Sequence, residues 1–250
     1  MRGSGAAYYI VSVNTPAVFH ITHHKAGSQW VKSILEGAAP DRFIPAQRQV
    51  AHVLGQPLAP GKVYPTVYLT RDRFEALDLP QPHRRFIIIR DLRDTLVSLY
   101  FGLKVHHHLF RNDQREVRAL LNNCDVEAGL IFLIYERLSK SADIQHSWLG
   151  AEELTVHYED LLREPFDHFA RIMAHCEINI EPERLRELVE TRNFRNVARR
   201  LPGEENIRSH QRKGIAGDWR THFTDRVKDA FKQRYAQLLI DTGYETTTAW

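Results

Sequence analysis

Short apolar runs alternate with helical patterns along this chain, and that alternation constrains its fold more than any other feature. Residues 17–22, 63–69, 85–90 and 154–158 are rich in β-forming apolar side chains. Such runs are typical of buried strands in a parallel sheet. Because helical patterns lie between these strands, the sequence predicts an α/β fold, a parallel sheet flanked by helices on both sides.

The helices are predicted from apolar spacing and from the residues that begin or end them. After the first strand, Trp30, Val31, Ile34 and Leu35 recur at helical spacing, with Gly37 as the expected stop. The remaining expected helices are one opened by Asp91 and Asp94, residues 126–149, and most of the chain from Pro165, ending in the amphipathic stretch 224–240. Residues 47–61, which hold several Pro and Gly, are expected to form a loop.

The composition is that of one globular domain covering residues 1–250. The chain is 43% hydrophobic and 26% charged, which is ordinary for a soluble protein. Met1 to Ser4 are interpreted as an expression-tag remnant and left out of the fold prediction. No apolar run approaches the roughly 20 residues of a membrane helix, so no membrane segment is expected.

The net charge and the number of cysteines limit which partners and which cellular compartment are expected for this protein. The net charge of +3 suits an anionic ligand but is too small to indicate nucleic acid. The two cysteines, Cys124 and Cys176, require no disulfide framework, so a reducing compartment, the cytoplasm, is predicted.

The loop after the first strand carries the first candidate site. Amides freed at the start of a helix next to Gly27 form an anion site, and Lys25 adds a cation. The alternative is an ordinary turn with a solvated lysine. A Walker A loop needs its Lys after the second Gly, whereas Lys25 precedes Gly27, so an ATP-type phosphate loop is a poor match.

Two more basic elements follow. Arg90 ends a buried strand, and its planar guanidinium suits a phosphate; pairing with Asp91 or Asp94 is the structural alternative. Residues 212–220 combine two glycines with cations, and this combination would let the backbone approach an anion closely. The alternative is that this segment is an ordinary basic loop. Lys25, Arg90 and Tyr158 all follow strands, and ligands of parallel sheets bind at that edge.

Together these residues resemble the family of sulfotransferases that use 3′-phosphoadenosine 5′-phosphosulfate (PAPS), most closely its cytosolic branch. Residues 22–30 look like the family's 5′-phosphosulfate loop, and the spacing from Arg90 to Ser98 matches its 3′-phosphate motif. Residues 212–219 look like its C-terminal cofactor loop. The resemblance runs in order from about Ala17 to Gly243.

The resemblance assigns roles to individual residues. Lys25 would bind the 5′-phosphosulfate and stabilise the leaving group, and Trp30 would stack on the adenine. The cofactor-binding residues it implies are Lys25, Ala26, Gly27, Ser28, Gln29, Trp30, Arg90, Ser98, Tyr158, Thr191, Phe194, Arg212, Lys213 and Gly214. Thr191 and Phe194 are separated by one residue more than the family pattern.

A sulfotransferase implies a P-loop-like fold, PAPS as co-substrate, PAP as product and no metal. The acceptor would be a hydroxyl or amine on a small molecule or a glycan, with no nucleic-acid or membrane partner. Two alternative functions remain: a metabolite or nucleoside kinase, and a non-catalytic protein that binds PAP-like nucleotides or RNA ends.

Two parts of the family pattern are missing. No histidine occupies the position of the family's catalytic base, where residues 68–75 stand. Three candidates for the general base remain: Asp72 first, His24 second and the triple histidine 106–108 third. The structural alternative for Asp72 is an ion pair with Arg71 or Arg73, and the alternative for one of His23 and His24 is a role in shaping the loop.

The family's dimerisation motif is also altered, because Asp225 replaces its apolar residue. This substitution predicts a monomer or a dimer through another surface.

Overall fold

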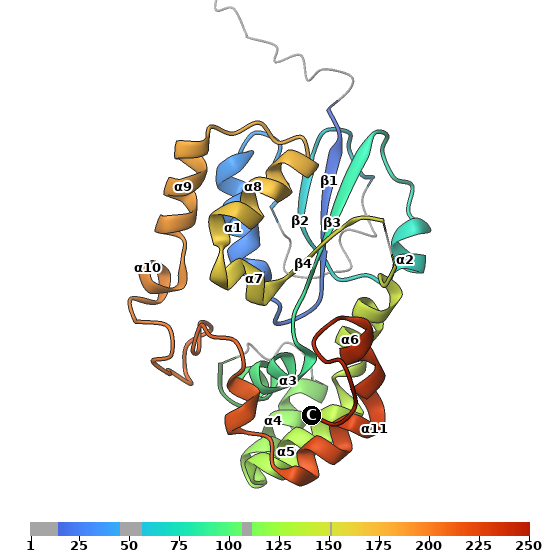
Figure 1. The fold of residues 1–250 in the computed structure, drawn as a ribbon, viewed down its shortest axis with the longest axis vertical. Helices are drawn as coiled ribbons and strands as arrows, with labels where there is room; N and C mark the ends of the chain where they lie inside the picture. Colours follow the sequence, from blue (N-terminus) through green and yellow to red (C-terminus); the bar gives the residue numbers. More distant parts are fainter. Residues whose placement is uncertain (1–14, 46–56, 107–111, 151) are drawn as a thin grey trace, which may run out of the picture.

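A four-stranded parallel sheet forms the centre of the molecule (Figure 1). The computed structural model describes residues 15–45, 57–106, 112–150 and 152–250. The strands are β1 (Ala17–Thr22), β2 (Val63–Val67), β3 (His83–Ile89) and β4 (Leu154–His157), in the order β2-β1-β3-β4. Each neighbouring pair is parallel, so the predicted parallel sheet is confirmed.

The two faces of the sheet bury alternate residues of the same strands. Val18, Ile88 and Val156 pack against one helical layer, made by α1 (Ser28–Ala38), α8 (Pro165–His175) and α9 (Pro182–Thr191). Phe19 and Ile87 face the other side, where they pack with Phe74 of α2 (Arg71–Glu75), Ile144 of α6 (Ser139–Ser147) and Trp148, the residue that follows α6. Because both faces are covered, these strands are apolar without a period of two.

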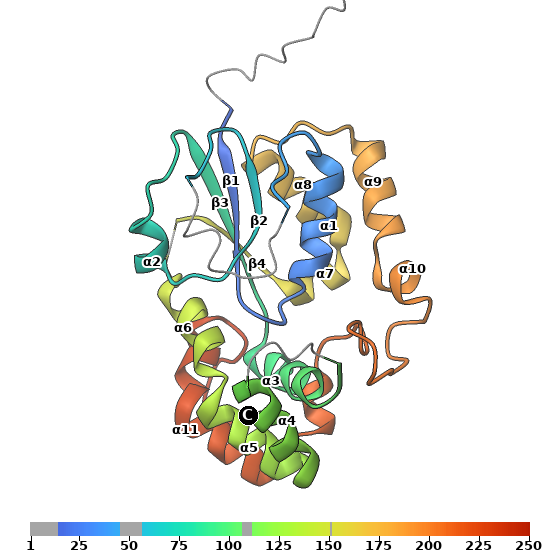
Figure 2. The same cartoon turned by 180° about the vertical axis from the view of Figure 1, so that it is seen from behind.

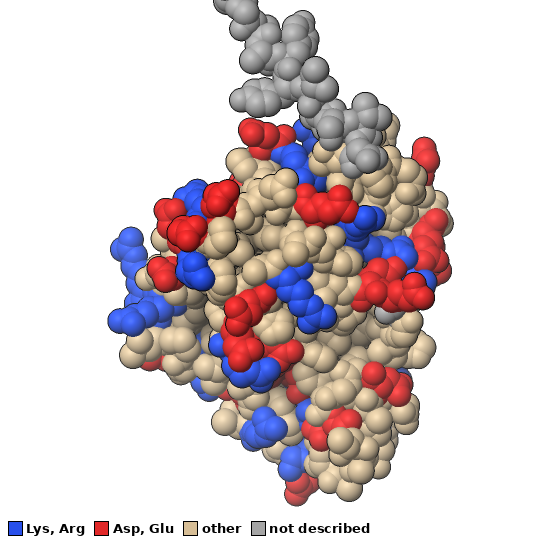
Figure 3. All heavy atoms as spheres, turned by 45° about the horizontal axis from the view of Figure 1, so that its top comes forward, with Lys and Arg blue, Asp and Glu red and all other residues tan. Residues whose placement is uncertain are grey.

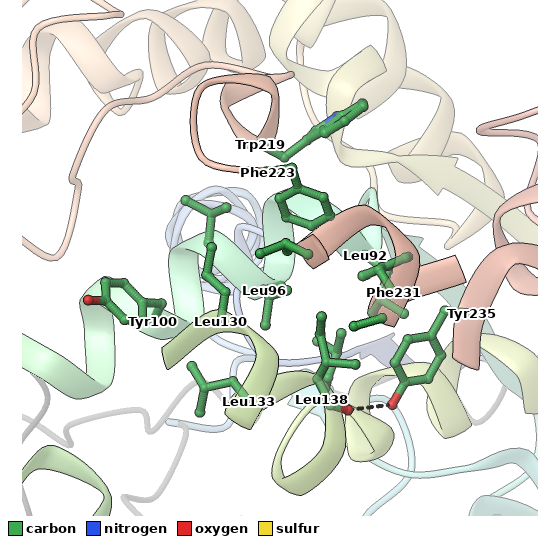
Figure 4. Close-up of a cluster of buried hydrophobic side chains, with 14 of the residues drawn as sticks. Leu92, Leu96, Tyr100, Leu130, Leu133, Leu138, Trp219, Phe223, Phe231 and Tyr235 are labelled. Carbon is green, nitrogen blue, oxygen red and sulfur yellow. Dashed lines mark hydrogen bonds between the residues drawn. The ribbon is translucent and has the colours of Figure 1, made fainter. Parts of the chain in front are cut away.

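A helical subassembly lies beyond the carboxyl ends of the strands (Figures 1 and 2). It contains α3 (Leu92–Phe101), α4 (Asn112–Asn123), α5 (Val126–Glu136) and α11 (Asp225–Asp241). Figure 4 shows the core between them, where the Tyr235 hydroxyl donates to the Ile134 carbonyl at 3.2 Å. The edge of the sheet where β1, β3 and β4 end therefore faces this subassembly.

Several predicted boundaries differ from the structure. Gly37 does not stop its helix; it lies within α1, where a β-carbon would meet Arg192 and Leu188 of the neighbouring segment. The stretch 126–149 divides into α5 and α6, because Arg137 leaves the helical conformation. Tyr158 opens α7 (Tyr158–Arg163) rather than ending a strand.

The C-terminal third is less helical than expected. After α9 and α10 (Phe194–Ala198), residues 199–217 form no helix. The short 3₁₀ helix η3 (Asp218–Thr221) comes before α11, and earlier in the chain the short π-helix η2 (Gly102–His106) follows α3. Of the expected loop 47–61, residues 47–56 lie outside the described part, as does the segment interpreted as a tag remnant. Across the described residues, no helix combines the length and the apolar character needed to span a membrane.

Candidate functional site

The loop between β1 and α1 adopts a backbone conformation that few residues tolerate. Lys25 has φ 71° and Gly27 has φ 77°, both in the left-handed region. A β-carbon at Gly27 would collide with the ring of Tyr158, so glycine is required for both its φ and its contact. The first turn of α1 starts at Ser28 with no side chain capping it, which leaves backbone amides at the loop.

Lys25 lies in this loop among other cations. Burial, together with the positive charges of Arg90 and Arg212, lowers the pKa of its ammonium to about 8. The left-handed backbone of Lys25 is also strained, and such strain persists only where the surrounding structure fixes it. Because the charges of two arginines act on this lysine, an anion bound here would relieve their repulsion.

Arg90 follows β3 and joins the loops at this edge of the sheet. One terminal nitrogen donates to the Lys25 carbonyl at 3.0 Å and the other to the Ile215 carbonyl at 3.4 Å. Its guanidinium carbon lies 4.8 Å from the centre of the Tyr158 ring. Among the described residues, its buried Nε–H has no hydrogen-bond partner.

The structural alternative for Arg90 is realised only in part. Its guanidinium approaches the Asp94 carboxylate at 3.8 Å, while Asp91 pairs with Arg93 instead. Burial by itself would lower the pKa of Arg90, but Tyr158 and nearby acids, Asp94 among them, raise it. Arg90 therefore stays charged while its Nε–H remains available to an anion.

The C-terminal basic loop is held by one carboxylate. Arg212 and Lys213 both form ion pairs with Asp218, and Arg212 also pairs with Glu205. Burial would raise the pKa of Asp218, but its bonds to His222, Lys213 and Arg212 lower it far below the usual range. The cations are thus positioned by Asp218.

Asp94 attaches the same loop to α3. Its carboxylate accepts hydrogen bonds from the backbone N–H of Gly217 at 2.7 Å and of Trp219 at 2.9 Å. Gly214 lies against the ring of Phe194, where a β-carbon would clash. These contacts bring segments far apart in sequence to the edge where β1 and β3 end.

The other residues assigned from the family resemblance lie as follows. Ala26 is fully buried, Gln29 is exposed, and Ser98 is half-buried on α3. Trp30 packs edge-on against Phe169, with ring centres 5.3 Å apart. Thr191 is exposed at the end of α9, and its hydroxyl donates to the Glu187 carbonyl at 2.7 Å.

His24 and Tyr68 form a pair beside Lys25. Their ring centres are 4.1 Å apart, and the Tyr68 hydroxyl lies 2.9 Å from the Ser28 hydroxyl. Although His24 is exposed as a residue, the surrounding protein partly desolvates its imidazole, and this desolvation together with the charges of Lys25 and Lys140 lowers its pKa to about 4. His24 is therefore neutral near pH 7.

Asp72 lies in a different setting. It is exposed on α2, and hydrogen bonds from Thr70 and from the Arg73 backbone lower its pKa. Arg71 pairs with Glu75 at 2.8 Å. Figures 1 and 2 both place α2 beside the sheet, apart from the loop that joins β1 to α1.

The third candidate, the triple histidine, lies outside what the structure describes: residues 107 and 108 are not described, nor is the side chain of His106. His23, two positions before Lys25, is fully buried, and burial lowers its pKa to about 3. It holds the loop in place rather than facing solvent.

Sequence reasoning missed two residues near this site. Gln145 of α6 donates to His23 and to the Arg90 carbonyl, and Tyr68 contacts His24 and Ser28. Neither belongs to a motif. The only sequence signal was the unusual pair of histidines before Lys25, which need partners when buried.

Charges of both signs are mixed over the face drawn in Figure 3. A broad single-sign surface of the kind that binds nucleic acid is not seen on that face. Within the described residues, no cluster of three or more His, Cys, Asp or Glu side chains has a metal-site arrangement.

Residues 81–243 match the family model described as a sulfotransferase domain. Human sulfotransferase 1C2 is 22% identical over 254 residues, which cover 89% of this chain and 82% of that protein. Rat sulfotransferase 1C2 is 28% identical over 100 residues, which cover 36% of this chain and 34% of that protein. The family model begins after the loop of Lys25, whereas the human alignment extends over most of the chain.

Solved structures share the fold. Mouse sulfotransferase SULT7A1 complexed with PAP has a TM-score of 0.63 at 15% identity, over 90% of this chain and 85% of that one. Retinol dehydratase in complex with androsterone and PAP has a TM-score of 0.55 at 16% identity, over 90% and 81% of the two chains. At these identities the likeness establishes the fold alone.

Proposed function

The chain belongs to the sulfotransferase family, and on that premise we propose that it moves a sulfuryl group from PAPS to a hydroxyl or amine, releasing PAP. The observation that carries this proposal is the convergence of Lys25, Arg90 and Tyr158 at one edge of the sheet. A nucleotide with a phosphosulfate and a second phosphate needs separate cationic groups, and Arg212 supplies a further one near Lys25.

The residues present fit such a nucleotide. The buried Nε–H of Arg90, without a partner among the described residues, suits a phosphate oxygen. Gly27 and Gly214 have no side chains, and this allows the rings of Tyr158 and Phe194 to pack directly against the two loops. We assign the 5′-phosphosulfate to the loop 25–30, and the 3′-phosphate to Arg90, Ser98 and the loop 212–214.

Lys25 is proposed to act on the leaving oxygen. Sulfuryl transfer, like phosphoryl transfer, depends mainly on positioning and on stabilising the charge that develops in the transition state. A lysine whose pKa is lowered to about 8 is still mostly protonated near pH 7. Its ammonium can therefore hold the negative charge that builds up when the sulfur–oxygen bond breaks, and the proposed reaction needs no metal.

For the general base we propose His24 ahead of Asp72. His24 is neutral near pH 7 and adjoins Lys25, so its imidazole is free to accept the proton of an attacking hydroxyl. Asp72 is exposed, and its described contacts all lie within its own segment. Asp72 remains the second candidate.

The acceptor is proposed to be a small molecule, with a glycan as the alternative. Retinol dehydratase was crystallised with retinol and with androsterone, both small hydrophobic molecules bearing a hydroxyl. A cytoplasmic location is proposed from the cysteine content and the family.

Membership of the sulfotransferase family argues against the kinase alternative. A non-catalytic binder of PAP-like nucleotides remains the competing proposal. It predicts PAP binding without turnover, whereas the retention of Lys25 beside Arg90 favours catalysis.

The test combines nucleotide binding with turnover. PAP at 100 times its Kd should stabilise the protein by about 2.7 kcal/mol and raise its melting temperature, while ATP, without a 3′-phosphate, should do much less. Incubation with PAPS and a panel of phenols, steroid alcohols, sugars and amines should release PAP with at least one acceptor. Equal shifts from PAP and ATP would contradict the nucleotide assignment, and binding without any turnover would favour the non-catalytic alternative.

A further inference from the structure

Gln145 links the two strands that end at the proposed site, although it belongs to neither. It lies on α6 with 2% of its surface exposed. Its Nε2 donates to the Arg90 carbonyl at 2.7 Å, which identifies that atom as the amide nitrogen. The same nitrogen lies 2.7 Å from Nε2 of His23.

These contacts fix the protonation state of His23. Its Nε2 faces two donors, the Gln145 amide and the Arg90 backbone N–H at 3.2 Å, and must therefore accept. The proton lies on Nδ1, which donates to the His24 carbonyl at 2.9 Å. His23 thus has one neutral tautomer in which every ring nitrogen is used.

The result is a buried connection that reaches the backbone on both sides of Lys25. Both peptide groups of Arg90 are tied, its N–H to His23 and its carbonyl to Gln145. The Arg90 guanidinium then donates to the Lys25 carbonyl, and His23 donates to the His24 carbonyl. Lys25 is held in its left-handed conformation by bonds to its own carbonyl and to the one before it.

We propose that Gln145 is a positioning residue of the sulfuryl-transfer site, acting through His23 and Arg90 to hold Lys25 and its neighbours in the reactive geometry. The inference rests on the proposed function. A displacement of about 1 Å at a reacting group costs on the order of 100-fold in rate. An apolar side chain at position 145 would remove the Gln145 donor from the Arg90 carbonyl and would leave Nε2 of His23 with the Arg90 backbone N–H as its remaining donor.

The central experiment compares Gln145→Leu with Gln145→Glu across pH. Gln145→Leu should lower kcat about 10- to 100-fold at every pH, with a smaller loss of PAP affinity. In Gln145→Glu the introduced carboxylate faces the Arg90 carbonyl and His23, so it cannot donate until a proton is taken up. The activity of Gln145→Glu relative to wild type should therefore rise as the pH falls from 8 to 6.

The surroundings of position 145 contain few other titratable groups. On the loop side, His24 and Arg90 act on His23. On the other side, Gln145 borders a cavity of about 180 Å³, whose described lining includes His157 and Asp241. The exposed neighbour on α6, His146, provides the matched control, and His146→Ala should keep wild-type kcat, pH profile and melting temperature.

Hydrogen exchange tests the proposed positioning independently of the reaction. The amides of residues 23–27 and of Arg90 should exchange faster in Gln145→Leu than in wild type or His146→Ala, whether or not any acceptor is turned over. Turnover absent in wild type would refute the sulfotransferase proposal, while faster exchange would still confirm the positioning of the loop. Unchanged exchange, a kcat of Gln145→Leu within about 3-fold of wild type, or identical pH dependence in the Leu and Glu variants would each overturn the inference.

Discussion

The guanidinium of Arg90 donates a hydrogen bond to the backbone carbonyl of Lys25 across 3.0 Å. This bond joins the end of β3 to the loop after β1, so two residues 65 positions apart are in direct contact. Arg90 also contributes to the lowered pKa of Lys25. The two residues are nevertheless expected to serve different purposes, and the predictions below begin from that difference.

Replacing Lys25 and Arg90 should produce different kinetic losses. Lys25→Ala should lower kcat far more than PAP affinity, because its charge acts mainly on the leaving oxygen. Arg90→Ala should weaken PAP binding by about 1.5–3 kcal/mol, or roughly 10- to 150-fold, the value of a charge-assisted hydrogen bond. Steady-state kinetics with PAPS and calorimetric titration with PAP measure both effects. Identical profiles for the two variants would show that the roles are wrongly assigned.

The pH dependence should report the state of Lys25. Its pKa of about 8 means that the positive charge is present below pH 8 and is lost as the pH rises above it. The value of kcat/KM for PAPS should therefore fall above about pH 8. Bound polyanion favours the charged form, so kcat should fall only at higher pH. Lys25→Arg keeps its charge, so its kcat/KM for PAPS should stay constant between pH 8 and pH 10. A decline like that of wild type would mean that another group titrates.

Removal of the general base should be visible in kcat alone. His24→Ala, assayed at saturating PAPS, should lose about 100-fold in kcat with PAP affinity intact, since a positioned base contributes ~10²–10⁴-fold. Asp72→Ala is the direct comparison, and His106, His107 and His108 are substituted singly in the same way. A large loss only in Asp72→Ala would reverse the ranking. Near-full kcat in every variant would mean that the acceptor brings its own ionised nucleophile or that the acceptor pocket lies elsewhere.

Acid should destabilise the protein through its buried histidines. Burial lowers the pKa of His20 to about 4 and that of His23 to about 3, whereas an unfolded histidine titrates near 6.5. Between these values the unfolded state binds more protons, so stability falls as the pH falls. Each histidine should contribute about 1.4 kcal/mol per pH unit below pH 6. The free energy of unfolding, measured with urea from pH 7 to pH 4.5, should depend less steeply on pH in His20→Gln than in wild type. The exposed control His146→Ala should show the wild-type dependence on pH.

The assembly state is expected to be monomeric, or dimeric through a surface other than the family's usual one. Asp225 is exposed and pairs with Lys228 at 3.2 Å, and a charge there opposes a small apolar contact. Thr224 is engaged within the chain, where its hydroxyl caps α11 and donates to Glu127. Thr224→Ala should therefore cost about 1 kcal/mol of stability and leave the mass measured by light scattering unchanged. A dimer that this substitution dissociates would contradict the prediction.

The sequence by itself determined the parallel α/β architecture and the order of the strands along the chain. Strands 17–22 and 85–90 were recognisable because a strand buried on both faces needs an uninterrupted apolar run, which is local information. The position of Lys25 and Arg90 after strands followed from the same pattern, since carboxyl ends of parallel strands share one edge. Family resemblance then assigned the nucleotide roles, which remain predictions.

Only the tertiary structure decided which side chains meet at that edge. Gly37 looked like a helix stop, but it is a point of close packing against Arg192, which lies far away in sequence. Gln145 belongs to no motif, because its role depends on the position of α6 relative to β1 and β3. Hydrogen bonds between segments more than 50 residues apart depend on the packing of whole elements, and no local pattern in the sequence encodes them.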